Sequence, residues 1–411
     1  QNTPLKVDTG DTAWVLVSSA FVLAMLMPGL ALFYGGLVRT KNVLGTIMQS
    51  VMILSVVSLL WILFGYSLAF GPDKGGVIGG LEWVGLSGVG SEPHPVYGPT
   101  IPHQAFMLFQ LMFAAIAPAL ITGAFAERKR FTSVVLFAAL WSVFVYVPLA
   151  HWIWGGGWLA KLGALDFAGG AVIHISSGAA ALVCAIVLGK RRGYGTDYMA
   201  PHNLPMTLLG TGFLWFGWFG FNGGSALGAN GIAVSAIIAT HAAAAMGAIA
   251  WCGAEWAHRG KPTVLGVASG AVAGLATVTP AAGYIAPMSA IAIGLVAGMT
   301  CYAAIVWKGR FGYDDSLDVV GIHGVGGVIG ILATGLFASK VVNPGGADGL
   351  FFGNPGLFGI QLLVAAVTTI FSIIGTFVIL KLVDSMTGLR VSSEEEATGL
   401  DLSQHNERAY S

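Results

Sequence analysis

Apolar runs of about 20 residues recur along the whole sequence, and they constrain the fold more than any other feature. A helix of that length spans the hydrocarbon core of a bilayer. Only 9% of the residues are charged, against about 25% in ordinary soluble domains. The chain is therefore predicted to be an all-α, polytopic membrane protein.

We predict about eleven membrane-spanning helices by the ~20-residue criterion. The 60 glycines suit such a bundle because small residues let membrane helices approach closely. Cys184, Cys252 and Cys301 lie inside apolar runs without metal-ligand spacing, so we interpret them as packing residues and expect no metal or other cofactor. The spans are expected to begin near Trp14, Leu44, Gln104, Phe131, Phe167, Asn203, Gly231, Val264, Ile285, Val319 and Gly356.

Lysine and arginine predict the orientation of the helices. One set of alternate loops carries 12 of these residues, whereas the other set and the N-terminal segment carry 4. Because basic loops stay in the cytoplasm, we expect the N-terminus outside and the C-terminus inside. A start at Gln1 is compatible with a removed signal peptide. The formal net charge of zero gives no indication of a nucleic-acid partner.

An acid and an imidazole recur in two of the apolar spans. Asp166 precedes His174, and Asp318, which lies 152 positions after Asp166, precedes His323. Five predicted spans separate the two acids, and an odd number of crossings inverts the second copy. We therefore predict two inverted five-helix repeats, at about residues 12–190 and 203–340, and an eleventh helix at about 356–383. Such repeats place a substrate route at their interface, near the bilayer midplane.

The histidines are the candidates for chemistry inside the membrane. Ionisable groups at that depth usually face an interior pathway and often relay protons or bind ions. Two neutral histidines that hydrogen-bond neighbouring helices are the alternative. Asp166 and Asp318 begin their spans, where a carboxylate caps free amide groups. Capping is the preferred interpretation for Asp318, whereas Asp166 is as well suited to stabilising a waiting cation.

Aromatic residues gather where several spans meet the outside. Phe106, Phe109 and Phe113 recur at helical spacing, and the segments 151–158 and 215–225 are rich in tryptophan, phenylalanine and glycine. An interfacial aromatic belt accounts for part of this pattern. Aromatic faces beside a serine hydroxyl also suit a small cation that carries N–H groups. No acidic ring or carbonyl filter is evident, so conduction of hydrated metal ions is less favoured.

Six motifs resemble those of bacterial ammonium transporters of the Amt family, and the resemblance covers nearly all 411 residues. It implies a homotrimer with one pore per subunit and ammonium, or methylammonium as its analogue, as the substrate. Related Rh-type channels typically lack the tryptophan at the pore mouth that is present here. The motifs are Pro28-Gly-Leu-Ala-Leu-Phe-Tyr-Gly-Gly36, Gly123-Ala-Phe-Ala-Glu-Arg128, Ala164-Leu-Asp-Phe-Ala-Gly-Gly170, Pro201-His-Asn-Leu-Pro205, Gly217-Trp-Phe-Gly-Phe-Asn222 and Gly321-Ile-His-Gly324.

The resemblance also implies a role for each candidate residue. Trp154, Phe113 and Ser225 would bind ammonium outside, with Asp166 close by. Phe113 and Phe221 would form a stacked gate, and His174 and His323 would be the twin histidines of the pore. Further positions linked with the pore or its mouth are Phe109, Tyr146, Trp218 and Thr279.

The expected function is ammonium uptake across the inner membrane. Ammonium would lose its proton at the gate and ammonia would cross the pore, while the proton either follows along the imidazoles or stays outside. A passive ammonia channel and an ammonium sensor are the alternatives. An intramembrane enzyme is disfavoured because no nucleophile or metal set accompanies the His and Asp pairs.

The last residues form a second region. We predict a transmembrane domain at 1–384 and a cytoplasmic regulatory tail at 385–411. The composition of Ser392–Asp401 predicts an acidic, solvated segment that is helical at first. The tail resembles the part of the Amt family that takes part in control by a PII signalling protein.

Overall fold

Long apolar helices make up most of the computed structural model, which describes residues 5–410. Within that range, ten helical segments are long and apolar enough to cross a bilayer, so an all-α membrane fold is confirmed. The predicted eighth span corresponds to an apolar helix of only 15 residues, Val264–Val278. Gln1, which a removed signal peptide would precede, lies outside the residues that the structure describes.

The spanning segments begin within five residues of the predicted positions. They are Thr9–Leu37, Thr40–Phe70, His103–Phe125, Phe131–Lys161, Gly170–Leu188, Leu204–Gly224, Gly231–Arg259, Pro287–Phe311, Val320–Phe337 and Pro355–Thr387.

Several spans consist of more than one helical element, because π-helical or 3₁₀ turns interrupt them. Elements of the first half are α1 (Thr9–Ala24), η1 (Met25–Leu30), α2 (Ala31–Leu37), η2 (Thr40–Asn42), α3 (Val43–Leu60), η3 (Trp61–Gly65), α4 (Tyr66–Phe70), η4 (Val84–Leu86), α5 (His103–Phe125), α6 (Phe131–Trp141), η5 (Ser142–Tyr146), α7 (Val147–Ile153), α8 (Trp158–Lys161), η6 (Gly170–Ile175) and α9 (Ser176–Leu188). Elements of the second half are α10 (Leu204–Gly224), α11 (Gly231–Arg259), α12 (Val264–Val278), α13 (Pro287–Lys308), η7 (Gly309–Phe311), η8 (Val320–Val325), α14 (Gly326–Phe337), η9 (Leu350–Phe352), α15 (Pro355–Thr387), α16 (Ser393–Thr398) and α17 (Leu400–His405).

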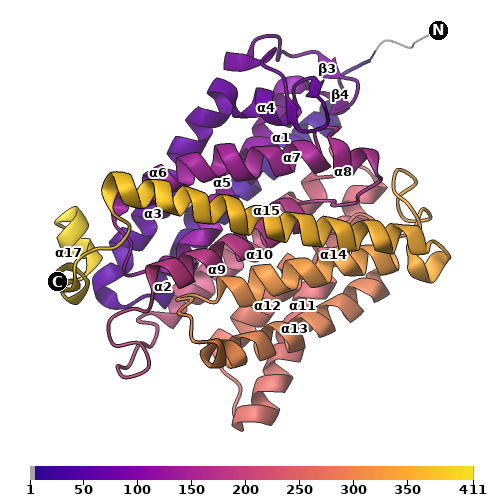
Figure 1. Ribbon diagram of the computed structural model, residues 1–411. Coiled ribbons are helices and arrows are strands. Elements are labelled where there is room, and N and C mark those ends of the chain that lie inside the picture. Colours follow the sequence, from indigo (N-terminus) through magenta and orange to yellow (C-terminus); the bar gives the residue numbers. More distant parts are fainter. Residues whose placement is uncertain (1–4, 411) are drawn as a thin grey trace.

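Strands occur only in the loop between α4 and α5, within the described part of the chain. β1 (Asp73–Lys74) pairs antiparallel with β2 (Ile78–Gly79), and β3 (Pro93–His94) pairs antiparallel with β4 (Gly98–Pro102). The second pair lies near the N-terminal end of the molecule in Figure 1. The first pair lies against α8, because the Trp158 backbone N–H donates to the carbonyl oxygen of Gly76, between β1 and β2, at 3.0 Å.

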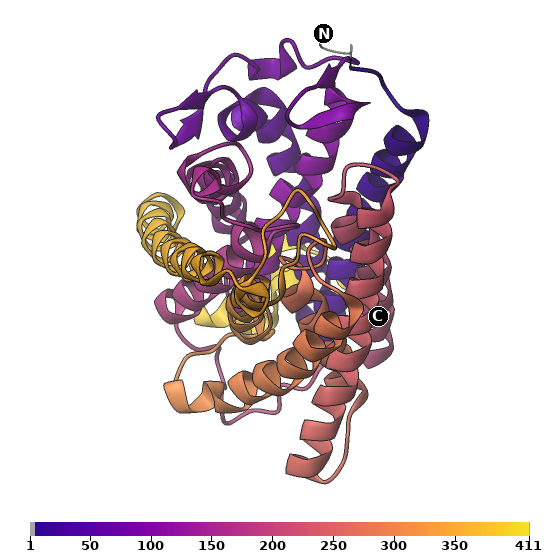
Figure 2. The same cartoon turned by 90° about the vertical axis from the view of Figure 1, so that its right-hand side faces the viewer.

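The helices of the two halves pack around a shared centre, and α15 crosses the outside of both (Figures 1 and 2). α15 contacts α6 and α9 of the first half and α14 of the second. At the centre, η6 packs against α14 and α9 packs against η8. Gly178 of α9 and Gly324 of η8 meet so closely that a side chain on Gly178 would overlap the Gly324 backbone. Glycine at this crossing therefore brings the two interrupted helices into direct contact.

Both candidate histidines lie in π-helical turns, His174 in η6 and His323 in η8. Such turns are rare and frequent at functional sites, because the wider turn redirects a side chain and frees backbone groups. The local likeness of η6 and η8 agrees with the repeat prediction, whereas repeats over five helices each remain a prediction.

The C-terminal tail is docked on the bundle, so the segment predicted to be solvated is only partly so: Ser392, Ser393 and Glu394 are exposed, whereas two of its acids are buried. Glu396 and Asp401 are each 2% exposed. Glu396 accepts hydrogen bonds from Arg390 at 2.7 Å and from the Arg192 backbone N–H at 2.6 Å. Asp401 accepts one from the Gly45 backbone N–H at 2.8 Å. The predicted initial helix is present as α16, which begins with a Ser392–Glu395 capping box.

Candidate functional site

A cavity of about 510 Å³ lies near the strand pairs, at the end of the bundle that the topology prediction assigns to the outside. Three of the predicted site residues, Phe113, Trp154 and Ser225, line it together. Gln110, which the sequence analysis did not single out, also lines it, and its Oε1 is buried without a protein partner among the described residues. Its other lining residues are Phe70, Val96, Tyr97, Phe106, Ile153, Phe167, Leu227, Tyr284 and Gly345.

The aromatic and hydroxyl groups of this cavity are held by backbone contacts. The Trp154 indole Nε1 donates to the Asp166 carbonyl oxygen at 2.8 Å. The Ser225 hydroxyl donates to the Phe221 carbonyl oxygen at 2.8 Å, which leaves its own oxygen free to accept a hydrogen bond. The Phe113 ring meets the Trp154 ring edge-on, with centroids 6.0 Å apart. The cavity thus offers π faces and a hydroxyl acceptor to a small cation.

Two phenylalanines form what we call the aromatic floor: Phe113 lines the cavity, and Phe221 packs against Phe113 from outside the lining. The ring centroids of Phe113 on α5 and Phe221 on α10 lie 4.4 Å apart, with an interplanar angle of 38°. Both side chains are buried, and Phe109 contacts Phe113 from the preceding turn at 4.8 Å. The two phenyl rings carry no polar atom that could replace the water around a cation.

The two histidines lie beyond the phenylalanines. Their Nδ1 atoms are 3.2 Å apart and their rings are nearly parallel, at 19°. His174 also stacks with Phe221, whose centroid is 6.2 Å away, and with Trp218 at 5.6 Å. The predicted meeting of the two imidazoles is therefore present, and the aromatic floor leads directly to it.

Below the histidines the cavity space is small, about 10 Å³. The lining includes His323 and Trp218, and the Trp218 indole donates to the Thr279 hydroxyl at 2.9 Å. Tyr146 is buried near Trp61 and lines neither of these spaces. The remaining lining is Met25, Leu30, Phe33, Tyr34, Leu120, Leu214, Val272, Leu317, Val319 and Ile322.

Asp166 caps η6, the turn that carries His174. Its two carboxylate oxygens accept from the backbone N–H groups of residues 169 to 172, at 2.8, 2.6, 2.8 and 3.1 Å. The side chain is 5% exposed. Burial raises the pKa of this carboxyl, while the four N–H groups act in the opposite direction. Asp166 therefore shapes the site by ordering η6 and by placing its carbonyl oxygen against Trp154.

Comparisons with known proteins agree with this geometry. The sequence model of the Ammonium Transporter Family matches residues 13–410. The chain belongs to the ammonium transporter family. It is 53% identical over 402 residues to an ammonium transporter of Bacillus subtilis, covering 98% of both chains. It is 50% identical to ammonium transporter Amt1 of Archaeoglobus fulgidus, covering 98% of this chain and 99% of that one.

Solved structures show the same fold. The crystal structure of Saccharomyces cerevisiae Mep2 has 38% identity and a TM-score of 0.88, covering 94% of this chain and 88% of Mep2. A sensor Amt protein has 30% identity and a TM-score of 0.87, covering 96% of this chain and 98% of that chain. Proteins of this family are transporters or channels and not enzymes.

Asp318 is not the counterpart of Asp166 in this ammonium transporter, so the predicted pairing was wrong. Asp318 forms an ion pair with Lys308 and makes no capping contact. Asp315 instead accepts from the Val320 backbone N–H at 2.8 Å, at the start of η8. The two histidines are 149 positions apart, and Asp315 follows Asp166 by the same separation. Each capping acid thus lies eight positions before its histidine.

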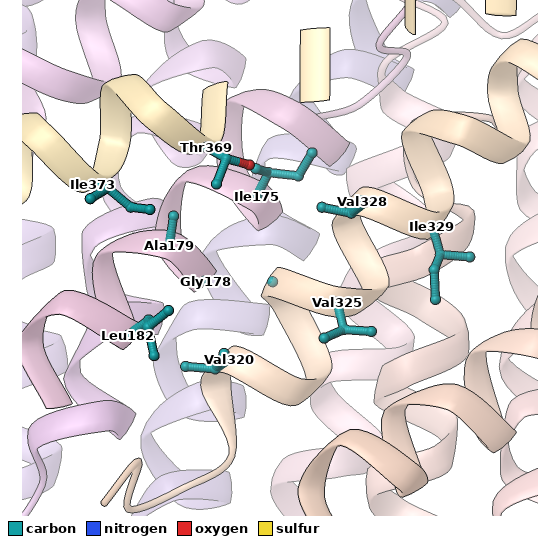
Figure 3. Close-up of a pocket in the computed structure, with 11 residues that line it drawn as sticks. Ile175, Gly178, Ala179, Leu182, Val320, Val325, Val328, Ile329, Thr369 and Ile373 are labelled. Atoms are coloured by element: carbon teal, nitrogen blue, oxygen red, sulfur yellow. The ribbon is translucent and has the colours of Figure 1, made fainter. Parts of the chain in front are cut away.

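An apolar groove of about 290 Å³ lies between α9, α14 and α15 of the transporter, beside the Gly178–Gly324 crossing (Figure 3). Its lining is aliphatic apart from Thr369, whose hydroxyl donates to the Ala365 carbonyl oxygen of its own helix at 2.7 Å. The groove offers no group that would bind ammonium. Among residues 5–410, no three His, Cys, Asp or Glu side chains are grouped as metal ligands.

Proposed function

We propose that this member of the ammonium transporter family takes up ammonium by separating it into ammonia and a proton. Support comes from three features, each in contact with the next: the cavity with π faces, the Phe113–Phe221 ring pair, and the His174–His323 pair. The ring pair next to the histidines is the single observation that carries the proposal. It separates a region that suits a cation from one that suits a neutral molecule.

Capture takes place in the external cavity. Trp154 and Phe113 present π faces to the cation, Ser225 accepts one of its N–H groups, and Asp166 holds the indole through its carbonyl oxygen. Ammonium fits because it has four N–H donors and a charge that aromatic faces attract by about 0.5–2 kcal/mol each. Potassium has the charge but cannot donate a hydrogen bond to Ser225.

Deprotonation occurs at the aromatic floor. Moving a charge between Phe113 and Phe221 removes its water without replacement, and that cost is many kcal/mol for an ion and far smaller for neutral ammonia. Ammonia therefore passes and its proton takes a separate course. The Nδ1–Nδ1 contact of His174 and His323 gives that proton a path between the two imidazoles. Proton transfer along it makes the uptake electrogenic.

The assembly and setting of the transporter are part of the same proposal. It acts as a homotrimer in the inner membrane, with the N-terminus outside and the C-terminus in the cytoplasm. Residues 1–384 form the transporting domain, with inverted repeats at about 12–190 and 203–340, and residues 385–411 form the regulatory tail. A PII-type protein acts on that tail, which contacts the cytoplasmic loops through Glu396 and Asp401. Residues 1–4 and 411 of these ranges lie outside the described residues.

Ammonium-evoked current in proteoliposomes tests the proposal. We expect ammonium and methylammonium to evoke current and potassium to evoke none. The double variant His174→Ala with His323→Ala should remain folded, because it only removes two side chains that face each other, and should lose the current. Uptake of ammonium without current in the wild type would reject electrogenic transfer and leave a passive ammonia channel.

Growth of a transporter-deficient host on limiting ammonium distinguishes uptake from sensing. We expect the wild type to restore growth. The matched variant Ser225→Ala removes the hydroxyl acceptor and should raise the ammonium concentration needed for half-maximal uptake. Full signalling to a PII protein without restored growth would favour the sensor alternative.

A further inference from the structure

Asp315 is a buried acid whose second oxygen has no partner. The side chain is 0% exposed. Its Oδ2 accepts from the Val320 backbone N–H at 2.8 Å, whereas Oδ1 has no hydrogen bond from any described protein group. In Asp166, by contrast, both oxygens accept from two backbone N–H groups each. Capping therefore accounts for both oxygens of the Asp166 carboxylate but for only one oxygen of the Asp315 carboxylate.

Asp315 lies close in the chain to residues that line the inner end of the pore. It lies eight positions before His323 and precedes the segment Leu317–Val319, whose two end residues line the small space below the histidines. Tyr34, from α2, lines the same space and lies within electrostatic reach of Asp315. The acid thus adjoins the wall of the pore on the side that the topology prediction assigns to the cytoplasm.

The charged and titratable groups around Asp315 are few. Lys308 of α13 donates to the Asp315 carbonyl oxygen at 2.7 Å and pairs with Asp318. Tyr34 of α2, Tyr313 of the same loop and the buried guanidinium of Arg128, from the loop between α5 and α6, also feel its charge. Burial raises the pKa of Asp315 to about 6, with Lys308 acting in the opposite direction and Asp318 adding to the rise. A carboxyl with this pKa exchanges protons near neutral pH, which an ordinary aspartate does not.

We propose that Asp315 is the proton-exchange group at the inner end of the pore. This inference rests on the proposed proton transfer along the histidines. The protonated imidazole of His323 gives up its N–H proton, through water, to Asp315 Oδ1, so that the imidazole becomes neutral and the carboxyl becomes protonated. The carboxyl then loses the proton to ammonia that leaves the pore, which forms ammonium and restores the carboxylate. Lys308, held by Asp318, keeps the carboxylate form accessible.

The test measures ammonium-evoked current in proteoliposomes selected for the C-terminal tail inside, at lumenal pH 5 to 8. Asp315→Asn keeps an oxygen for the Val320 N–H but cannot exchange a proton. We expect its current to fall at least tenfold while ammonia flux, followed by lumenal alkalinisation, persists. The matched control Asp197→Asn removes an exposed carboxylate from the loop between α9 and α10, which the topology prediction places on the same side of the membrane, and should keep the current.

The wild-type pH profile provides a second, independent measurement, which remains informative if Asp315→Asn fails to fold. The current should decrease about tenfold at a lumenal pH one unit below the pKa of Asp315, since about a tenth of the carboxyl is then ionised. A flat wild-type profile between lumenal pH 5 and 8, or wild-type current in folded Asp315→Asn, would overturn the inference while electrogenic uptake stood. Uptake without any wild-type current would instead reject the proton transfer of the proposed function, and the role of Asp315 with it.

Discussion

Lys129 is a buried cation in the loop between α5 and α6, where its backbone forms a β-bridge with Arg390 of the tail. Its side chain is 1% exposed, and its Nζ has no hydrogen-bond partner among the described residues. The ammonium group lies over the rings of Phe125 and Phe137, at 4.2 and 3.9 Å from their centroids. Burial lowers the pKa of Lys129 from 10.5 to about 8.

Replacing this lysine by methionine should stabilise the protein. Lowering a lysine pKa from 10.5 to about 8 corresponds to a cost on the order of 3 kcal/mol for the charged form in the folded protein at pH 7. The two phenyl faces offset about 1–2 kcal/mol of that cost. Methionine fills similar space without charge. We therefore expect Lys129→Met to raise the free energy of unfolding by about 1–2 kcal/mol.

The pH dependence has a definite sign. In the unfolded chain the lysine keeps a pKa near 10.5, so between pH 8 and 10.5 the unfolded state binds more protons than the folded state. Wild-type stability consequently rises with pH across this window. The advantage of Lys129→Met should be complete below pH 8 and should disappear as the pH approaches 10.5.

Melting temperature in detergent micelles, measured at pH 7 and pH 10, tests these expectations. The matched control is Lys190→Met, because Lys190 is exposed and lies 5.7 Å from the centroid of Tyr194. We expect a rise of a few degrees at pH 7 for Lys129→Met, a smaller rise at pH 10, and little change for the control. A lower melting temperature for Lys129→Met at pH 7 would refute the reasoning, because the aromatic contacts would then outweigh the cost of burial.

Three further predictions concern the site and the tail. Asp166→Ala leaves four buried N–H groups without an acceptor, at about 1–3 kcal/mol each, so size-exclusion chromatography should find little folded protein; folded, active protein would contradict its capping role. Gly178→Val places a side chain into the helix crossing and should abolish ammonium uptake, whereas Ala179→Val, which enlarges a side chain in the groove of Figure 3, should retain most of it. Glu396→Ala removes the main hydrogen-bond acceptor of the tail and should hasten trypsin cleavage after α15, whereas the exposed control Glu394→Ala should not. Equal cleavage rates for the two variants would show that the Glu396 contacts do not hold the tail.

The fold could be predicted from the sequence because the signal is local. Each spanning helix is a run of apolar residues, and its ends are marked by charged or glycine-rich segments within a few positions. The histidines stood out for a similar reason, as single imidazoles in apolar surroundings. Their contact brings η6 and η8 together, as the repeated motif predicted, whereas the inversion of the two repeats stays a prediction.

The errors arose where long-range contacts decide the outcome. Asp314, Asp315 and Asp318 lie within five positions, and nothing local shows which of them caps η8. Asp318 turns away to Lys308, which belongs to another helix. The tail appeared solvated because its acids are close together in sequence, but Glu396 pairs with Arg390 of the tail and also accepts from the backbone N–H of Arg192, 204 positions away. The ring contact between Phe113 and Phe221 was expected from the family resemblance alone, because periodicity cannot pair their two helices.

If protons pass between the two histidines as proposed, the contact between them also limits how often a proton can pass. At 3.2 Å, the two Nδ1 atoms share one hydrogen bond, so one imidazole is the Nδ1–H tautomer and the other accepts from it. When a proton is passed along the pair, the donor and the acceptor exchange these roles, and a second proton cannot follow in the same direction until both tautomers are restored. Restoring the two tautomers need not move a net charge between the rings of Phe113 and Phe221. Each cycle would therefore carry one proton at most, and the rate of tautomer recovery would set the ceiling on the current.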